Sequence, residues 1–263
     1  MGVPSLSSCP DGSLYQPPIG GYLYNVNISR NVSGVNIGQA VRVMPKPKSS
    51  NPAPAQPYHH GDLRRALIDT AVAMVTEEGA WNFTLREVAR RAGVSHAAPY
   101  NHFQDKAELL AEVAALGFQA LRQAMAQACR RHPRSARQAL VGIAAAYVRF
   151  GVEHPGHYRL MFGPELGEKE RYPVLEQAGN ATFAELTGAL ERGQAAGEVR
   201  RGSVRDQGLA AWSLVHGLTT LLIDQRLSFL GVSVSEAERQ ARVAGAALVE
   251  GLSAATESSG ARS

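Results

Sequence analysis

The sequence of 263 residues lacks any apolar run of the length that a membrane-spanning helix needs. Cysteine is nearly absent, since Cys9 and Cys129 are the only two and stand far apart in dissimilar surroundings. A disulfide framework is therefore not expected, and a reducing cytoplasm is the simplest location for the chain. Aromatic residues make up only 6%, whereas alanine and leucine dominate the second half, which favours helix over sheet. We expect an all-α fold.

Signatures of catalysis are missing as well. No glycine-rich phosphate loop precedes a helix, and no nucleophile elbow occurs. His154 and His157 have a spacing compatible with metal binding, but the pattern holds no Cys or carboxylate partner at a ligating spacing. We therefore interpret them as ordinary loop histidines, and expect neither enzymatic activity, nor a cofactor, nor a metal site.

The charge balance favours nucleic acid as a partner only weakly. The net charge is +4 and the isoelectric point about 9.2. Residues 58–110 hold six basic and seven acidic side chains, so the most informative part of the chain is not itself a basic patch. Basic residues gather instead in the preceding tail, at Arg42, Lys46 and Lys48, and again over residues 122–137.

Residues 84–106, TLREVARRAGVSHAAPYNHFQDK, carry the strongest local signal. Thr84 occupies an N-cap position with Glu87 three residues later, which is the spacing of a capping box. Gly93 can adopt the positive φ of a tight turn after this first helix, and Ser95 can cap a second, short helix. The pattern predicts a helix-turn-helix, the motif that places one helix in the major groove of DNA.

The exposed face of the second short helix separates this prediction from a plain helical hairpin. Capping boxes and glycine turns are common, but a solvated structural helix would more often carry Glu, Lys and Gln on its outer face. Ala97 and Ala98 are small enough for the backbone to approach base edges and thymine methyl groups. Hydrogen-bonding side chains of short reach fill the rest of the face: His96, Tyr100, Asn101 and His102.

Residues 59–110, above all GVSHAAPYNHFQDK followed by Glu108, Leu109 and Leu110, resemble the DNA-binding domain of the tetracycline-repressor (TetR) family. Pro99 departs from the leucine that is commoner there. In the first turn of a short helix its missing N–H has no partner to lose, so the resemblance holds.

The resemblance implies a division of DNA contacts between the backbone and the bases. Positions that hold phosphates and fix the register match Thr84, Tyr100, His102 and Lys106. Positions that face bases match Ser95, His96, Ala97 and Ala98, with Asn101 as a further contact. The side chain of Arg86 could reach either a phosphate or solvent.

Composition divides the chain into domains. Nine of the 14 prolines fall within residues 1–57, and we expect that segment to be a disordered tail. Met44 opens a short basic lead, so residues 1–43 are either the product of a misplaced start codon or a genuine longer tail. We expect a helix-turn-helix DNA-binding domain over residues 58–106, a helical regulatory and dimerisation domain over residues 107–255, and a disordered end over residues 256–263.

Helical periodicity continues through the second half of the chain. One long helix, capped by Asp105, should leave the first domain and enter the second. The expected helices cover residues 61–78, 105–131, 135–153, 157–162, 173–193, 204–230 and 235–254.

The penultimate helix is apolar on two faces, so one face should meet a second subunit. With the last helix and their symmetry mates it would form a four-helix dimer interface. The expected interface residues are Leu209, Trp212, Ile223, Leu227, Ala241 and Leu248. Trp212 followed by His216 and Gly217 also resembles a Trp-His-Gly (WHG) signature of one class of C-terminal domain in the same family.

These features predict a homodimeric transcriptional regulator, a repressor that a small-molecule effector releases from a near-palindromic DNA operator. The alternative is a small-molecule-binding or interaction protein that merely retains the helix-turn-helix. Aromatic and methionine side chains of the second domain are the candidate ligand contacts, with ordinary core packing as the competing interpretation. They are Tyr147, Phe150, Tyr158, Met161, Phe162, Trp212 and His216.

Overall fold

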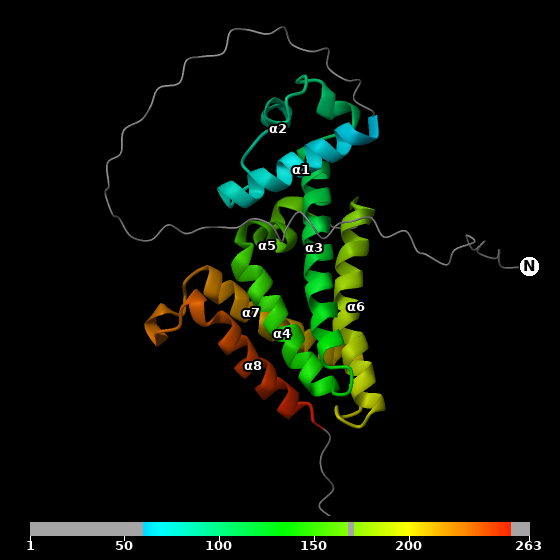
Figure 1. Ribbon diagram of the computed structural model, residues 1–263, viewed down its shortest axis with the longest axis vertical. Coiled ribbons are helices and arrows are strands. Elements are labelled where there is room, and N and C mark those ends of the chain that lie inside the picture. The colour runs from blue at the N-terminus through cyan, green and yellow to red at the C-terminus, as the bar shows by residue number, and fades with distance from the viewer. Residues whose placement is uncertain (1–59, 168–170, 254–263) are drawn as a thin grey trace, which may run out of the picture. The chain divides into compact units, whose positions relative to one another are not determined.

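The computed structural model describes residues 60–167 and 171–253, and all regular structure within these ranges is helical (Figure 1). The expected all-α fold is therefore confirmed for this part of the chain. The expected tail over residues 1–57, with its two alternative starts, and the expected end over residues 256–263 lie outside the described residues. None of the described helices is long and apolar enough to cross a membrane.

The N-terminal domain consists of α1 (His60–Glu78), α2 (Leu85–Arg91) and the 3₁₀ turn η1 (Ala98–Asn101). A small apolar core joins them. Its fully buried or nearly buried side chains include Leu67, Val75, Phe83, Val88 and Phe103.

The ends of α2 follow the predicted local chemistry. The Thr84 hydroxyl oxygen accepts a hydrogen bond from the Glu87 backbone N–H at 3.2 Å, and the Glu87 carboxylate accepts one from the Thr84 backbone N–H at 2.6 Å. This pair completes the capping box. Gly93 then adopts a φ of +72°, a conformation that residues with a Cβ rarely take. Both predictions are confirmed.

The second short helix differs from the prediction. Instead of an α-helix capped by Ser95, the chain forms one 3₁₀ turn that begins after Ala97 and has no side-chain cap. Pro99 supplies the physical reason, because an α-helix starting at Ser95 needs an N–H at position 99 to donate to the Ser95 carbonyl. That carbonyl accepts from the Ala98 N–H instead, at 3.0 Å, which is the tighter spacing of a 3₁₀ turn.

Helix α3 (Lys106–Arg131) runs without interruption from the N-terminal domain into the C-terminal one, as predicted. The Asp105 carboxylate accepts a hydrogen bond from the Glu108 backbone N–H at 2.9 Å and so caps it. Twelve residues along α3 are buried, and the helix packs against α4 (Ala136–Glu153) and α6 (Pro173–Ala195), which lie on either side of it (Figure 1). The helix is therefore a continuous connection between the two domains.

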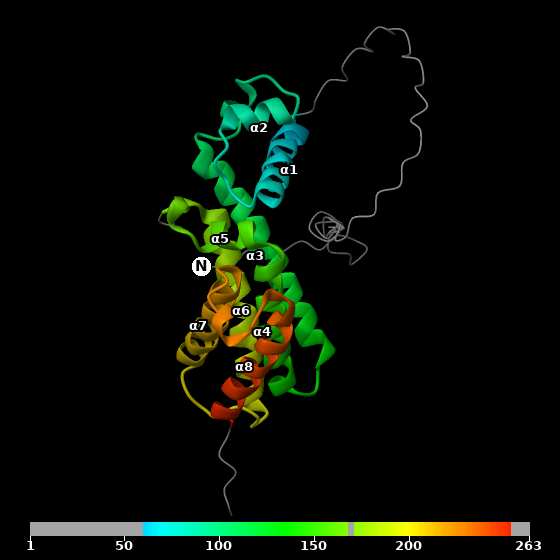
Figure 2. The ribbon, with the colours of Figure 1, turned by 90° about the vertical axis from the view of Figure 1, so that its left-hand side faces the viewer.

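The remaining elements complete the C-terminal domain. Helix α8 (Ala237–Gly251) packs along α4, and α7 (Val204–Ile223) contacts α4, α6 and α8 (Figure 2). Gly245 permits the close approach of α8 to α4, because a Cβ there would lie 3.0 Å from the Ala144 Cβ. The shorter elements are α5 (Pro155–Phe162), η2 (Pro164–Leu166), η4 (Ser228–Leu230) and η5 (Val234–Glu236).

The prediction that the penultimate helix extends to residue 230 is wrong, because α7 ends at Ile223. Gln225 adopts a φ of +55°, which an α-helix cannot accommodate. The Arg226 N–H then turns back to donate to the Leu221 carbonyl at 2.8 Å. The apolar periodicity that continues past the end of α7 belongs to a turn and to η4.

Candidate DNA interface and ligand cavity

The segment from the glycine turn to η1 forms an exposed surface. Ser95, His96, Ala97 and Asn101 are all exposed, and Tyr100 keeps 54% of its surface accessible. These side chains belong to one turn of chain held by the buried Pro99 and by the α2 cap. The arrangement is able to present hydrogen-bonding groups to the edges of base pairs.

Two of the predicted contacts require correction. Ala98 is only 9% exposed and packs inside the domain, so it lacks the surface that a base contact needs. His102 is partly buried, and its Nε2 is enclosed without a hydrogen-bond partner among the described residues. A phosphate contact through His102 Nε2 is therefore not available in this conformation.

Thr84 and Arg86 lie at the start of α2, and Lys106 lies at the start of α3. Thr84 donates its hydroxyl hydrogen to the Glu87 carboxylate at 2.9 Å. The backbone N–H and hydroxyl of Thr84 lower the pKa of Glu87, which therefore stays ionised. The Lys106 ammonium lies 5.7 Å from the centre of the Phe83 ring, a distance that holds the charge over the ring face.

The sequence had not singled out Arg90, which is exposed on α2 next to this surface. Arg86 and Arg90 form no ion pair within the described ranges. Arg91 and Arg64 are engaged, since Arg91 pairs with Glu77 and Arg64 with a carboxylate of α3. Arg86 and Arg90 are thus the cations of α2 that remain free to meet phosphates.

A cavity of about 420 Å³ lies in the C-terminal domain between α3, α4, α6, α7 and α8. Most of its lining is aliphatic or aromatic. Its walls include Leu121, Met125, Ile143, Leu186, Leu190 and Val249. Pockets of this size and character accommodate small organic ligands.

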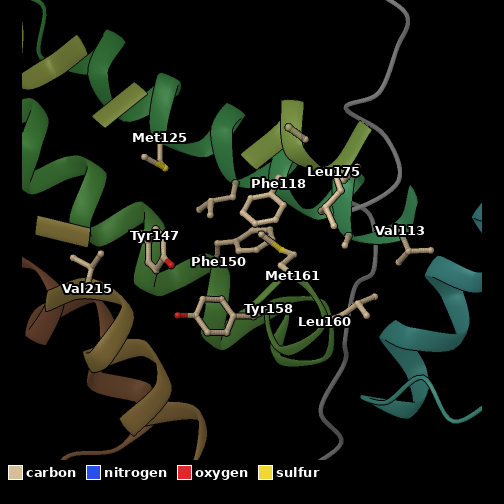
Figure 3. Packing of buried hydrophobic residues seen from close by; sticks show 14 of the residues in the cluster. Val113, Phe118, Met125, Tyr147, Phe150, Tyr158, Leu160, Met161, Leu175 and Val215 are labelled. Atoms are coloured by element: carbon tan, nitrogen blue, oxygen red, sulfur yellow. The ribbon is translucent and has the colours of Figure 1, made fainter. Parts of the chain in front are cut away.

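Three of the seven predicted ligand residues line this cavity: Tyr147, Phe162 and Trp212. The other four, Phe150, Tyr158, Met161 and His216, are not part of its lining. Phe150, Tyr158 and Met161 are buried, and Figure 3 shows them packed in the apolar core. For these three the competing interpretation, core packing, fits the structure better than ligand contact.

His216 belongs to an aromatic hydrogen-bond cluster made of Tyr147, Tyr158, Trp212 and His216. The Tyr147 and Tyr158 hydroxyls lie 3.0 and 2.7 Å from His216 Nδ1, and the Trp212 indole N–H donates to the Tyr147 oxygen at 3.0 Å. Burial raises the pKa of both tyrosines, so both phenols stay protonated. The cluster therefore connects the cavity wall to α5 through hydrogen bonds.

Helix α5 in turn touches the N-terminal domain. A Cβ at Gly156 would lie 2.8 Å from the Val75 carbonyl oxygen and 3.1 Å from the Gly79 backbone, so this start of α5 packs directly on the end of α1. The residues of α5 thus lie between the aromatic hydrogen-bond cluster and the N-terminal domain.

The sequence missed the polar residues at the cavity wall, Glu176, Asn180 and Arg205, and the aromatic Phe118 and Phe183. They come from three different helices, and no spacing in the sequence indicates that they share a cavity. The only usable signal was the apolar character of the helices themselves.

The expected dimer interface is only partly exposed. Leu209 keeps 50% of its surface but lies at the cavity, as do Trp212 and Leu248. Ala241 is fully buried within its own subunit, against the expectation that it meets a partner, because α8 packs closely on α4. Ile223 and Leu227 are partly buried.

Other apolar side chains of α7 and α8 are open to solvent instead. Leu214 and Leu221 on α7 are 38% and 42% exposed, and Val243 on α8 is 57% exposed. Leu214 and Leu221 are separated by two helical turns, so they share one face of α7. In the connection that follows, Phe229 is 80% exposed.

Family models match two stretches of the chain. The model described as bacterial regulatory proteins of the tetR family matches residues 67–113, which contain the helix-turn-helix. The model described as the C-terminal domain of tetracyclin repressor-like proteins matches residues 140–244, which contribute most of the cavity wall. Neither match tests the Trp-His-Gly resemblance.

Solved structures and a curated relative agree with these matches. A Rhodococcus sp. RHA1 protein of unknown function is 33% identical, with a TM-score of 0.65 over 75% of this chain and 99% of that one. The regulator FadR from Bacillus subtilis, solved with stearoyl-CoA, is 16% identical, with a TM-score of 0.55 over 71% of this chain and 98% of that one, which shows the fold alone. The uncharacterized HTH-type transcriptional regulator YobS from Bacillus subtilis is 29% identical over 98 residues, or 37% of this chain and 50% of that protein. The chain thus matches only about half the length of this curated relative.

Proposed function

Because this chain belongs to the tetracycline-repressor (TetR) family of helix-turn-helix transcriptional regulators, we propose that it binds a near-palindromic operator as a homodimer and represses transcription until a small-molecule effector releases it. The observation that carries the proposal is that one chain combines the exposed side chains of Ser95, His96, Ala97 and Asn101 with a mostly apolar cavity of about 420 Å³. The exposed side chains suit DNA and the cavity suits a ligand. Helix α3 runs continuously from the domain that holds the first to the domain that holds the second.

The DNA contacts follow from exposure and chemistry. Ser95, His96, Ala97 and Asn101 face the bases, since they are exposed and short enough to stay close to the groove floor. A separate set holds phosphates: Thr84, Arg86, Arg90, Tyr100 and Lys106. Ala98 is left out of the base-facing set because it is buried.

The dimer forms through the exposed apolar face of α7 and α8. Leu214, Leu221 and Val243 are large apolar side chains that a monomer would leave in water. A two-fold axis through this face would produce a four-helix interface and place two DNA-binding domains on successive turns of the duplex.

Effector release requires that the ligand prefer one arrangement of the domains over the other. Two physical connections support such coupling. Helix α3 spans both domains, and α5 joins the aromatic hydrogen-bond cluster to the end of α1. The FadR structure with stearoyl-CoA adds support for a small-molecule site in a protein of this fold.

The test is selection of DNA fragments from a random pool by the purified full-length chain, followed by titration of the selected sequence at two salt concentrations. A regulator should enrich an inverted repeat, and its preference for that repeat over random DNA should survive added salt, because base contacts do not depend on counterion release. Recovery of unrelated sequences, with all binding lost at high salt, would instead favour a ligand-binding protein that merely retains the motif.

A further inference from the structure

The cavity in the C-terminal domain is long. Leu175 and Leu190 both line it and stand 15 positions apart on α6. At 1.5 Å per residue the cavity therefore extends about 22 Å along that helix. An occupant that fills it has to be elongated.

Apart from the exposed Asn180 on α6, the polar groups along the middle of the cavity are already engaged with protein partners. The Thr182 hydroxyl is bonded to the carbonyl oxygens of Phe118 and Ala178, at 3.0 and 2.8 Å. The Tyr147 hydroxyl and the Trp212 N–H are bonded to each other. Beyond Asn180, a polar group on the middle of the ligand would lose its water without gaining a partner, so the ligand body has to be largely apolar.

Arg205 marks one end of this cavity. It lies in the first turn of α7, and Leu252, whose carbonyl accepts a hydrogen bond from the Arg200 N–H at 2.7 Å, also lines the cavity. Arg205 forms no ion pair with a described residue, and a helix N-terminus disfavours a positive side chain. Asp206 is in the same turn but does not line the cavity. An anion bound at Arg205 would therefore gain from both the side chain and the helix.

Glu176 is the charged cavity residue on α6, and the helix N-terminus stabilises its charge instead of opposing it. It lies in the first turn of α6, where the helix N-terminus already stabilises a carboxylate. Glu176 consequently needs no cationic ligand, whereas Arg205, which is exposed, forms no ion pair with a described residue. The polarity of the cavity assigns the ligand head group to the Arg205 end.

We infer that the occupant of this cavity is a single-chain amphiphile with a carboxylate head, its apolar chain along α6 and its head at Arg205. The inference rests on the proposed function only in treating this occupant as the effector. Such an amphiphile meets the three constraints that the cavity sets on its ligand: an elongated shape, an apolar body and one anionic end.

Calorimetric titration of the delipidated full-length protein tests this assignment, with octanoate, dodecanoate and hexadecanoate as probes below their micelle concentrations. Each added methylene that the cavity buries should tighten binding roughly threefold to fourfold. Dodecanol and dodecylamine share the dodecyl chain but differ in the head, and dodecanoate should bind at least tenfold more tightly than either. Affinity that does not increase with chain length, or tighter binding of dodecylamine, would overturn the inference.

Variants locate the two ends of the ligand. Arg205→Gln should weaken dodecanoate at least tenfold and leave dodecanol unchanged, whereas Arg201→Gln, exposed in the preceding loop and outside the cavity, should change neither. Leu186→Trp, which fills the cavity from α6, should abolish binding of the whole series while the protein keeps its helical circular dichroism. Unchanged binding by Leu186→Trp would place the ligand elsewhere and refute the assignment.

Two further measurements distinguish a free carboxylate from a thioester as the ligand, and test the ligand class independently of the proposed effector role. Dodecanoyl-CoA carries the same chain on a larger head, and binding of the thioester without binding of the free acid would rule out a carboxylate at Arg205. The effect of dodecanoate on the selected DNA is measured independently. Chain binding that leaves DNA affinity unaltered would uphold the ligand class and reject effector release.

Discussion

The indole N–H of Trp212 donates a hydrogen bond to the Tyr147 hydroxyl at 3.0 Å, and so joins α7 to α4 at the wall of the cavity. The same hydroxyl lies 3.0 Å from His216 Nδ1. A ligand that displaced the Trp212 ring would therefore disturb the entire aromatic hydrogen-bond cluster.

Tyr147→Phe should destabilise the protein by about 1–2 kcal/mol, because it leaves the Trp212 N–H without an acceptor in a largely apolar wall. A double-mutant cycle with Trp212→Phe, measured by urea unfolding, isolates the pair. The coupling free energy should be about 1 kcal/mol. Strict additivity of the two substitutions would show that the hydrogen bond contributes nothing.

Glu198 should stabilise the start of α4. Its carboxylate accepts hydrogen bonds from the backbone N–H groups of Ala136 and Arg137, both at 3.1 Å, and from the Ser135 hydroxyl at 3.0 Å. Glu198→Gln should cost about 1 kcal/mol at pH 7. The matched control is Glu191→Gln, an exposed position on α6.

The pH dependence of that difference has a definite sign. Burial acts to raise the pKa of Glu198, but the backbone N–H groups of Arg137 and Ala136 outweigh it and lower the pKa below its ordinary 4.5. The stabilisation is thus present above pH 4.5 and is lost as the pH falls through the lower folded-state value. A gap between wild type and variant that persists at pH 2 would contradict this account.

His157 should make the fold sensitive to mild acid. Burial, aided by the charge of His154, lowers the pKa of His157 from 6.5 to about 4, and its Nε2 is enclosed without a described partner. In the unfolded chain His157 is protonated below about pH 6.5, whereas in the folded chain it stays neutral down to about pH 4. The free energy of unfolding therefore decreases as the pH is lowered from 6.5 to 4. The loss at pH 5 should be about 2 kcal/mol. His157→Phe should show a smaller loss between pH 7 and pH 5 in parallel urea titrations, and an equal loss would exclude His157 as its source.

His96 and Lys106 should affect DNA binding in different ways. His96→Ala should relax the base preference at one position of each half-site, whereas Lys106→Ala should weaken all sequences about equally and reduce the salt dependence of binding. Competition titrations with single-base variants of the selected operator measure both effects. Identical behaviour of the two variants would refute the division into base and phosphate contacts.

Leu221→Glu should convert the dimer into a monomer, since it places a charge on the exposed apolar face of α7. Sedimentation equilibrium gives the molecular mass directly. Gln177→Glu adds the same charge at an exposed position on α6 and should remain dimeric. A Leu221→Glu protein that still sediments as a dimer would assign the interface to another surface.

Local chemistry explains which elements the sequence could predict. The Thr84 and Asp105 caps, the positive φ of Gly93 and the apolar stripes of α1, α3 and α4 are each set by a few neighbouring residues, so they can be read from short spacings. The end of α7 could not be predicted in this way. Residues 224–230 keep the apolar periodicity of a helix, but the positive φ of Gln225 ends the helical backbone.

The candidate site divides along the same line. Ser95, His96 and Tyr100 are exposed where the sequence expected a DNA-facing surface, since a single turn of chain determines their exposure. The cavity depends on five helices meeting, and so the sequence identified Tyr147 and Trp212 but missed Arg205. The burial of Ala98 and Ala241 likewise results from packing between elements, which no local spacing encodes.

Pro99 has a consequence for transferring operator sequences between relatives. Because the ring nitrogen withholds a donor from Ser95, the pitch of the exposed turn, and with it the direction of the His96 side chain, is governed by a residue that touches no nucleotide. In a homologue with leucine at this position, the segment could form an α-helix instead of a 3₁₀ turn. The same outward side chains would then project in different directions. Two relatives with identical outward residues but a different residue at position 99 therefore cannot be assumed to bind the same operator sequence.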